Sequence, residues 1–145
     1  MRYIRQFLSL RFTDQRPLIE AFILLGISRF LILAIKFKTV APVLGKHGKE
    51  SANKVTAQDL EISKKVAWAV RVMSKHTVWE SKCLVQAMTA KIMLNRRKIS
   101  STIYLGVAKD EAQQLIAHAW LRCGDKILTG GGGRDKFTVV GIFGD

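Results

Sequence analysis

The sequence predicts an α+β domain, because helical patterns in the first two thirds of the chain give way to strand patterns in the last third. Between residues 56 and 73, apolar side chains recur every three or four positions, which is typical of a helix with one buried face. From residue 102 onward, apolar and polar side chains alternate, as they do in the strands of an antiparallel sheet. Helices that precede strands joined by short turns predict helices packed on an antiparallel meander.

The size and charge of the chain limit its function classes. Its 145 residues suffice for one domain with a buried core. A net charge of +13 favours an acidic partner, such as a carboxylate-rich peptide, a nucleic acid or an anionic membrane. The basic residues are spread from Arg2 to Lys136 without an aromatic-interleaved run, so we expect no nucleic-acid partner. No metal-ligand spacing surrounds either cysteine, and we expect neither a metal nor another cofactor.

Residues 18–35 form the most apolar segment, which Glu20 and Arg29 interrupt. The segment barely reaches the ~18 residues that suggest a membrane span. A helix that is apolar on nearly every side is expected to be buried in the protein, docked on a partner or lying on a membrane, and these alternatives stay open. The basic N-terminus is not followed by a signal-peptide cleavage pattern, and two cysteines cannot form a disulfide scaffold. We therefore expect a cytoplasmic protein, with peripheral membrane contact as an alternative.

Residues 36–54 have the composition of a loop or linker, because five lysines, Pro42 and two glycines interrupt the helical pattern. This stretch separates the apolar helix from everything that follows it. We therefore divide the chain into an N-terminal segment, residues 1–55, and a domain that comprises residues 56–145.

The elements of this domain can be placed from local signals. Thr56 is positioned to cap the first helix of the domain, and a second helix is expected to begin around Ser81–Cys83 and to end near Asn95. A hairpin turn is expected at Gly124-Asp125. Strands are expected at residues 103–107, 115–123, 126–129 and 137–143.

Cys83 is the candidate nucleophile. It lies where a helix is expected to begin, and the free N–H groups and positive dipole end of a helix stabilise a thiolate. The neighbouring Lys82 adds to this effect. The alternative interpretation of Cys83 is a small buried thiol without a chemical role. Cys123 ends a strand in which side chains alternate between faces, so it points away from His118 and is expected to be structural.

His118 is the candidate general base, because it is the one histidine that lies inside an expected strand. When a helix packs on an antiparallel sheet, a thiol at the helix N-terminus and an imidazole on a strand can exchange a proton. The pair of Cys83 and His118 therefore predicts nucleophilic catalysis better than either residue alone.

A third group normally orients the imidazole. With a two-residue hairpin turn, His118 would face Gly131. Trp120 would face Thr129 in the same register, so neither opposite position offers a carboxylate. Asp135 is a provisional third member on the glycine-rich loop, and a backbone carbonyl is the alternative. The third member stays unassigned.

Two motifs carry a resemblance to a known family. They are WESKCLVQA, residues 79–87, and AHAW, residues 117–120. With these motifs the chain resembles the leader peptidases of lasso peptide biosynthesis, which are relatives of the transglutaminase-like cysteine peptidases. The likeness extends through YLGV, residues 104–107, and FTVV, residues 137–140, and so covers roughly residues 58–143.

The resemblance implies a transglutaminase- or papain-like core, in which the helix that bears the cysteine packs on an antiparallel sheet. It further implies removal of the leader from a ribosomally synthesised precursor peptide during antibiotic maturation. Cys83 would attack to form a thioester and His118 would act as the general base. A separate ATP-dependent cyclase would then close the macrolactam ring. Because the residues before Thr56 hold no leader-recognition domain, we expect a separate recognition protein.

The chain departs from the family at one position. Members with a full triad tend to have an aspartate twelve residues after the histidine, where this chain has Gly130. This departure leaves the pair of Cys83 and His118 intact but does not supply its third member. The first alternative function is an amidase or a transglutaminase-type acyl transferase with the same pair. The second is a basic, non-enzymatic module that docks on a membrane surface or a partner.

Overall fold

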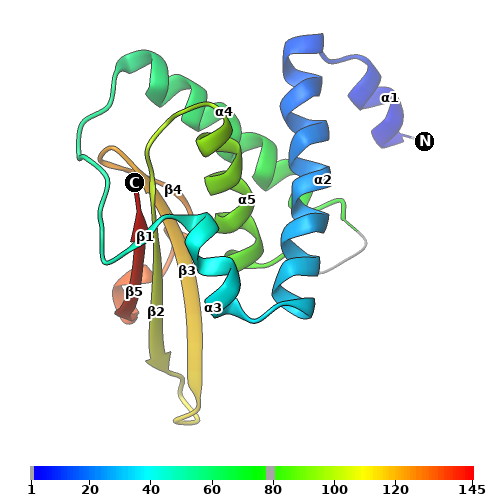
Figure 1. The fold of residues 1–145 in the computed structure, drawn as a ribbon. Coiled ribbons are helices and arrows are strands. Elements are labelled where there is room, and N and C mark those ends of the chain that lie inside the picture. The colour runs from blue at the N-terminus through cyan, green and yellow to red at the C-terminus, as the bar shows by residue number, and fades with distance from the viewer. Residues whose placement is uncertain (1, 78–80) are drawn as a thin grey trace.

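Helices fill most of the first two thirds of the chain and strands most of the last third, as predicted, so the fold is α+β (Figure 1). The computed structural model describes residues 2–77 and 81–145. The helices are α1 (Arg2–Leu8), α2 (Phe12–Ala34), α3 (Phe37–Val40), η1 (Ala41–Leu44), α4 (Ala57–Ser74), α5 (Cys83–Arg96) and η2 (Arg134–Lys136), of which η1 and η2 are short 3-10 helices. The strands are β1 (Lys46–His47), β2 (Thr102–Lys109), β3 (Leu115–Cys123), β4 (Lys126–Thr129) and β5 (Thr138–Gly144).

Helix α5 lies at the centre of the fold, between the sheet and α2 (Figure 1). Its small side chains Ala87 and Ala90 are fully buried, and so is Leu94 one turn later. Small residues on this face let the neighbouring helix and strand approach closely. Cys83 is the first residue of the same stripe and is half-buried at its end.

Helix α4 begins where the capping signal predicts. Oγ1 of Thr56 accepts a hydrogen bond from the backbone N–H of Asp59, at 3.1 Å, and so satisfies one of the free donors of the first turn. The predicted apolar face of α4 is buried at Val66 and Val70 and packs against α2 and α5.

Helix α2 begins at Phe12, ahead of the apolar segment of residues 18–35. One face, with Leu18, Ala21 and Leu25, is buried against α4 and α5. By length and composition alone the helix could cross a membrane, and 28% of its most apolar window is buried in the protein. Its opposite face is apolar and 45% to 68% exposed at Ile19, Ile23, Ile27, Phe30 and Leu33.

Residues 36–54, which the sequence predicted to be a loop or linker, contain two short helices and a short strand. Helices α3 and η1 follow α2 directly, and β1 joins the sheet. Val40 and Leu44 lie one helical turn apart and are both buried in the core. This apolar spacing attaches the segment to the domain although lysines and glycines dominate its composition.

The five strands are ordered β1-β5-β2-β3-β4, and every pair of neighbours is antiparallel. The predicted meander is therefore wrong at its last step, because β5 pairs with β2 instead of β4. Residues 130–137 carry the chain back to the far side of β2, which gains a partner on both edges. Ile103 of β2 then lies between Leu121 and Phe143, and all three side chains are buried.

The hairpin between β3 and β4 has the predicted turn but not the predicted register. Cys123 pairs with Lys126 across the turn, as expected. An irregularity between Leu121 and Arg122 then shifts the register, so that Thr129 faces Leu121 instead of Trp120. A bulge of this kind inserts one extra residue and moves everything beyond it along the strand.

Candidate active site

Cys83 is the first residue of α5, at the position that the sequence predicts. Lys82, the N-cap residue, makes no capping hydrogen bond through its side chain to the first N–H groups of the helix. Gln86 stabilises the residues just before α5, because its Nε2 donates a hydrogen bond to the Ser81 carbonyl at 2.8 Å. Trp79, which the motif includes, lies outside the described residues.

Cys123 differs from Cys83 in its surroundings. Its side chain is fully buried among α4, α5 and the sheet. Burial raises the pKa of the Cys123 thiol above its ordinary value, and a hydrogen bond with Ser63 opposes this rise only in part. A protonated, buried thiol is chemically inert, in agreement with its interpretation as structural.

His118 lies on β3, and its ring packs between two aromatic side chains. The ring centroid is 5.8 Å from that of Trp120 and 5.0 Å from that of Phe137. Its Nε2 lies 2.7 Å from the carbonyl oxygen of Gly130. Because a carbonyl oxygen can only accept, Nε2 carries the proton in this bond, and Nδ1 of the neutral ring is left with its lone pair.

Gly130 can hold this carbonyl in place only because it has no side chain. Its φ angle is +69°, in the left-handed region. A Cβ atom at this position would lie 2.3 Å from the Ala119 carbonyl oxygen and 3.1 Å from the Cα of Trp120. The position twelve residues after His118 thus has no room for a carboxylate side chain on the present backbone.

The structure does not bring Asp135 to the imidazole. This residue lies in η2, its side chain is 95% exposed, and its carboxylate is 3.9 Å from the guanidinium of Arg134. The described hydrogen-bond partner of His118 is instead the Gly130 carbonyl. Gly131, which the predicted register placed opposite His118, is displaced by the irregularity in the hairpin.

Cys83 and His118 line the same pocket, which has a volume of about 520 Å³ and is named the thiol pocket below. No hydrogen bond joins the two side chains in the part of the chain that the structure describes. Ala119 and Leu121 of β3 pack into the helical core. Because side chains alternate along a strand, the His118 side chain leaves β3 on the opposite face. Cys83 and His118 therefore line one pocket, but the imidazole ring packs against Trp120 and Phe137 and not against the thiol.

The rest of the thiol pocket is mainly apolar. Its walls come from α2, α3, α5 and the sheet, and Arg29 and Lys82 contribute its charged side chains. The apolar wall residues are Ile32, Phe37, Val40, Leu84, Val85, Leu105, Val107 and Val140. Among the described residues, no group of three or more His, Cys, Asp or Glu side chains could hold a metal ion.

Sequence reasoning missed the aromatic row that supports His118. Tyr104 stacks on Trp120 with ring centroids 5.7 Å apart, and its hydroxyl donates to Glu50 at 2.6 Å. Burial and the bond to Glu50 raise the pKa of the Tyr104 phenol. A Cβ at Gly106, which faces His118 in the register, would lie 2.8 Å from the Phe137 Cβ. A glycine inside a strand was the signal for this close approach.

The fold and site define a class of protein in which a thiol at a helix N-terminus packs on an antiparallel sheet beside a histidine-bearing strand. A family model described as transglutaminase-like superfamily matches residues 30–141. The chain belongs to the transglutaminase-like superfamily, whose members are usually cysteine peptidases or acyltransferases. A search of curated proteins and a search of solved structures found no match.

Proposed function

We propose that the chain is a cysteine peptidase that removes the leader from a lasso peptide precursor. The observation that carries this proposal is that Cys83, at the start of α5, and His118, on β3, line one pocket. The motifs around these two residues, which resemble those of lasso leader peptidases, support the choice of substrate. Membership of the superfamily supports the thiol chemistry itself.

The chemistry begins with proton transfer from the Cys83 thiol to Nδ1 of His118. The thiolate attacks the scissile carbonyl carbon, and the N–H groups at the start of α5 stabilise the oxyanion. The imidazolium returns its proton to the leaving amine of the core peptide, and the leader remains as a thioester. Water, deprotonated by Nδ1, then attacks the thioester, and the leader leaves with a free carboxylate while the thiol is restored.

In this proposal the third member is the Gly130 carbonyl. Its hydrogen bond to Nε2 supports the tautomer in which Nδ1 is left to accept a proton, which is the task of the carboxylate in a full triad. The proposed reaction requires the Cys83 thiol and the imidazole to meet when substrate fills the thiol pocket, because the two share no hydrogen bond among the described residues and His118 lies on the face of β3 opposite to Ala119 and Leu121.

The proposed partners follow from the same substrate. They are the precursor peptide, a separate protein that recognises its leader, and an ATP-dependent cyclase that closes the macrolactam ring on the freed core. The site of action is the cytoplasm. The net charge of +13 supports contact with acidic partners.

The test is cleavage of a co-encoded precursor, with and without the recognition protein, followed by mass spectrometry. We expect release of the leader, loss of cleavage in Cys83→Ala, and nearly full activity in Cys123→Ala. An adduct with an added amine in place of the hydrolysed leader would favour the acyl transferase. Equal cleavage by Cys83→Ala and the unchanged chain would eliminate the thiol mechanism.

One observation favours a second, non-enzymatic candidate. The exposed apolar face of α2 is the kind of surface that docks on a membrane or a partner. A chain that cleaves no precursor but binds anionic vesicles through this face would fit a membrane-surface module.

A further inference from the structure

Helix α3 separates two pockets. Phe37 lines the thiol pocket on one side and contributes to a second pocket of about 750 Å³ on the other. The second pocket, named the lysine pocket below, is formed by α3, η1, β1 and the end of β5. Because one side chain is common to both walls, a peptide bound in the lysine pocket lies next to the thiol pocket.

The floor of the lysine pocket is apolar. Phe37 meets Phe143 edge to face, with ring centroids 5.8 Å apart, and Ala41 and Pro42 extend this surface. Phe143 is also in contact with the ring of His47, with centroids 5.1 Å apart. Such a floor suits an apolar side chain of a ligand.

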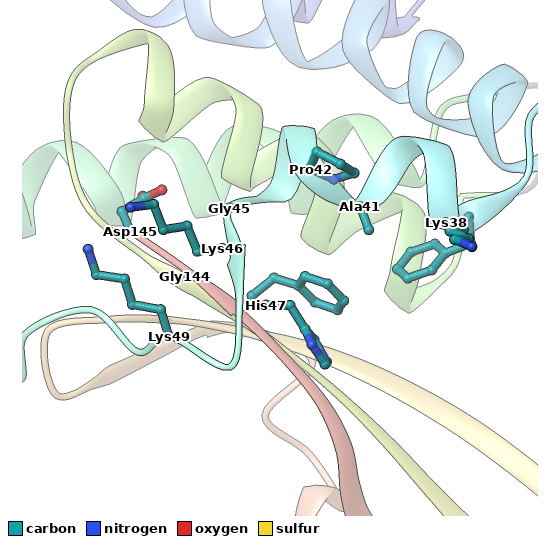
Figure 2. Close-up of a pocket in the computed structure, with 11 residues that line it drawn as sticks. Lys38, Ala41, Pro42, Gly45, Lys46, His47, Lys49, Gly144 and Asp145 are labelled. Carbon is teal, nitrogen blue, oxygen red and sulfur yellow. The ribbon is translucent and has the colours of Figure 1, made fainter.

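The rim of the lysine pocket is positive. Lys46 and Lys49 project at one end and Lys38 lies at the other, with His47 between them (Figure 2). All three lysines are exposed. In the described part of the chain, no hydrogen bond or ion pair engages their ammonium groups.

The one carboxylate side chain that lines the lysine pocket is already engaged. Oδ2 of Asp145 accepts a hydrogen bond from Nζ of Lys91 at 2.6 Å and another from the backbone N–H of Ser101 at 3.3 Å. It is therefore bound to the buried side of the pocket and does not neutralise the rim. The lysine pocket keeps an uncompensated positive charge around an apolar floor.

The backbone that carries two of these lysines is held firmly. Lys46 pairs with Gly144 in the sheet, and a Cβ at Gly144 would lie 2.2 Å from the carbonyl oxygen of Lys49. A Cβ at Gly45 would likewise lie 2.6 Å from the Gly144 carbonyl oxygen. Close backbone packing therefore fixes the positions from which the side chains of Lys46 and Lys49 project.

We propose that the lysine pocket binds an acidic segment of the peptide substrate, with an apolar side chain of that segment on the floor. The acidic character follows from the unpaired lysines and the apolar anchor from the two phenylalanines. Assignment of this segment to the substrate rests on the proposed function, because Phe37 lines both the lysine pocket and the thiol pocket that holds Cys83. Binding of an acidic peptide does not depend on that function.

The experiment measures binding, in a chain with Cys83→Ala so that no cleavage interferes. The probe is a short fluorescein-labelled peptide of glutamates around a single phenylalanine, followed by fluorescence anisotropy. Two control probes are matched to it, and each twin differs in one respect. In the first, glutamine replaces every glutamate; in the second, serine replaces the phenylalanine. We expect each twin to bind about tenfold more weakly, and binding of the acidic probe to weaken with salt.

The variant Lys38→Gln/Lys46→Gln/Lys49→Gln should lose the preference for glutamate over glutamine. Its matched control, Lys75→Gln/Lys109→Gln/Lys126→Gln, removes the same charge from exposed lysines elsewhere and should keep that preference within about twofold. Equal losses in both variants would overturn the proposal, because net charge alone would then explain binding. Displacement of the probe by an oligonucleotide at equal concentration would overturn the assignment to a peptide.

Precursor cleavage separates this inference from the proposed function. If the acidic probe binds as expected but Cys83→Ala cleaves precursor as well as the unchanged chain, the lysine pocket stands and the peptidase does not. If the precursor is cleaved but the acidic probe binds no better than its glutamine twin, the peptidase stands and this inference is wrong.

Discussion

The imidazole of His118 hydrogen-bonds to the main-chain carbonyl of Gly130, 2.7 Å from its Nε2, and not to a carboxylate. This contact fixes one ring nitrogen as the donor and leaves the other free to accept a proton. A carbonyl carries only a partial charge, so it stabilises the imidazolium less than an aspartate would. The proposed peptidase should therefore depend on the geometry of the loop at residue 130.

The two thiols should differ in reactivity. Cys83 is half-buried and lines the thiol pocket, whereas Cys123 is fully buried and burial raises the pKa of its thiol. We expect iodoacetamide to label Cys83 at least about tenfold faster than Cys123 in the folded chain, as peptide mass mapping would measure. In Cys83→Ala, labelling should appear only after unfolding in urea. Equal labelling of both thiols in the folded chain would contradict the burial of Cys123.

Gly130→Ala should weaken both the fold and the reaction. The left-handed backbone and the close Ala119 carbonyl oxygen make any Cβ unfavourable, and we expect a loss of about 1–3 kcal/mol in the free energy of unfolding. As the carbonyl moves, kcat should fall roughly tenfold to a hundredfold. Gly132→Ala is the matched control, since no heavy atom lies within 4 Å of a Cβ there. The two variants should differ in both urea midpoint and kcat.

Asp135→Asn tests the alternative third member. With the Asp135 side chain 95% exposed and the Nε2 of His118 bonded elsewhere, we expect kcat within about twofold of the unchanged chain. Loss of about a thousandfold or more, with the fold intact by circular dichroism, would make Asp135 the orienting group after all.

The buried ion pair predicts a pH-dependent stability. Lys91 is fully buried, and desolvation, opposed by Asp145, lowers the pKa of its ammonium group. At pH values between that lowered pKa and the ordinary value of 10.5, the Lys91 amine holds its proton in the unfolded chain more than in the folded chain. The free energy of unfolding therefore rises with pH in this range. At pH values below this range the folded chain bears the full desolvation cost of the buried Lys91 ammonium group.

Asp145→Asn removes the counter-charge of Lys91 and should therefore destabilise the chain most at neutral pH. We expect a loss of about 1–2 kcal/mol near pH 7, because Asp145 is 34% exposed and such pairs are worth less than fully buried ones. The difference should shrink near pH 10, where the amine of Lys91 can be neutral. Urea unfolding at both pH values measures it, with Asp125→Asn as an exposed control. A loss that grows with pH would contradict the assignment to Lys91.

The exposed face of α2 should make the isolated chain self-associate. Ile23 and Ile27 lie one turn apart on this face and are 54% and 45% exposed. We expect Ile23→Glu/Ile27→Glu to shift the chain toward a monomer in light scattering. Val43→Glu changes a similarly exposed side chain, 55% exposed, outside this face and should leave the association unchanged. A chain that is monodisperse before any substitution would show this prediction wrong.

Local signals sufficed to predict much of the fold. The cap at Thr56, the start of α5 at Cys83 and the turn at Gly124 each depend on a few adjacent residues, and the structure has all three. Helix α3 was missed because Phe37 and Val40 carry the apolar spacing in only four residues, surrounded by lysines. Short periodic segments give too few positions to distinguish a helix from a loop.

The candidate site required long-range information. The register shift at Leu121 depends on how β4 fits its neighbour, and the contact between His118 and Gly130 joins residues twelve positions apart across this irregular hairpin. A carbonyl acceptor has no residue type, so the sequence carried no direct sign of it. The return of β5 to β2 likewise depends on which strand edge the chain reaches after residue 130, not on alternation within the strand.

The hydrogen bond from His118 to Gly130 has a consequence for how this chain can vary. Every amino acid that could replace Gly130 keeps a main-chain carbonyl, so no substitution deletes the acceptor itself. Any substitution there adds a side chain that meets the Ala119 carbonyl oxygen, and the present loop has no room for an aspartate. A carboxylate could be acquired only after an earlier change had moved the loop, which makes the order of substitutions a constraint on the evolution of this site.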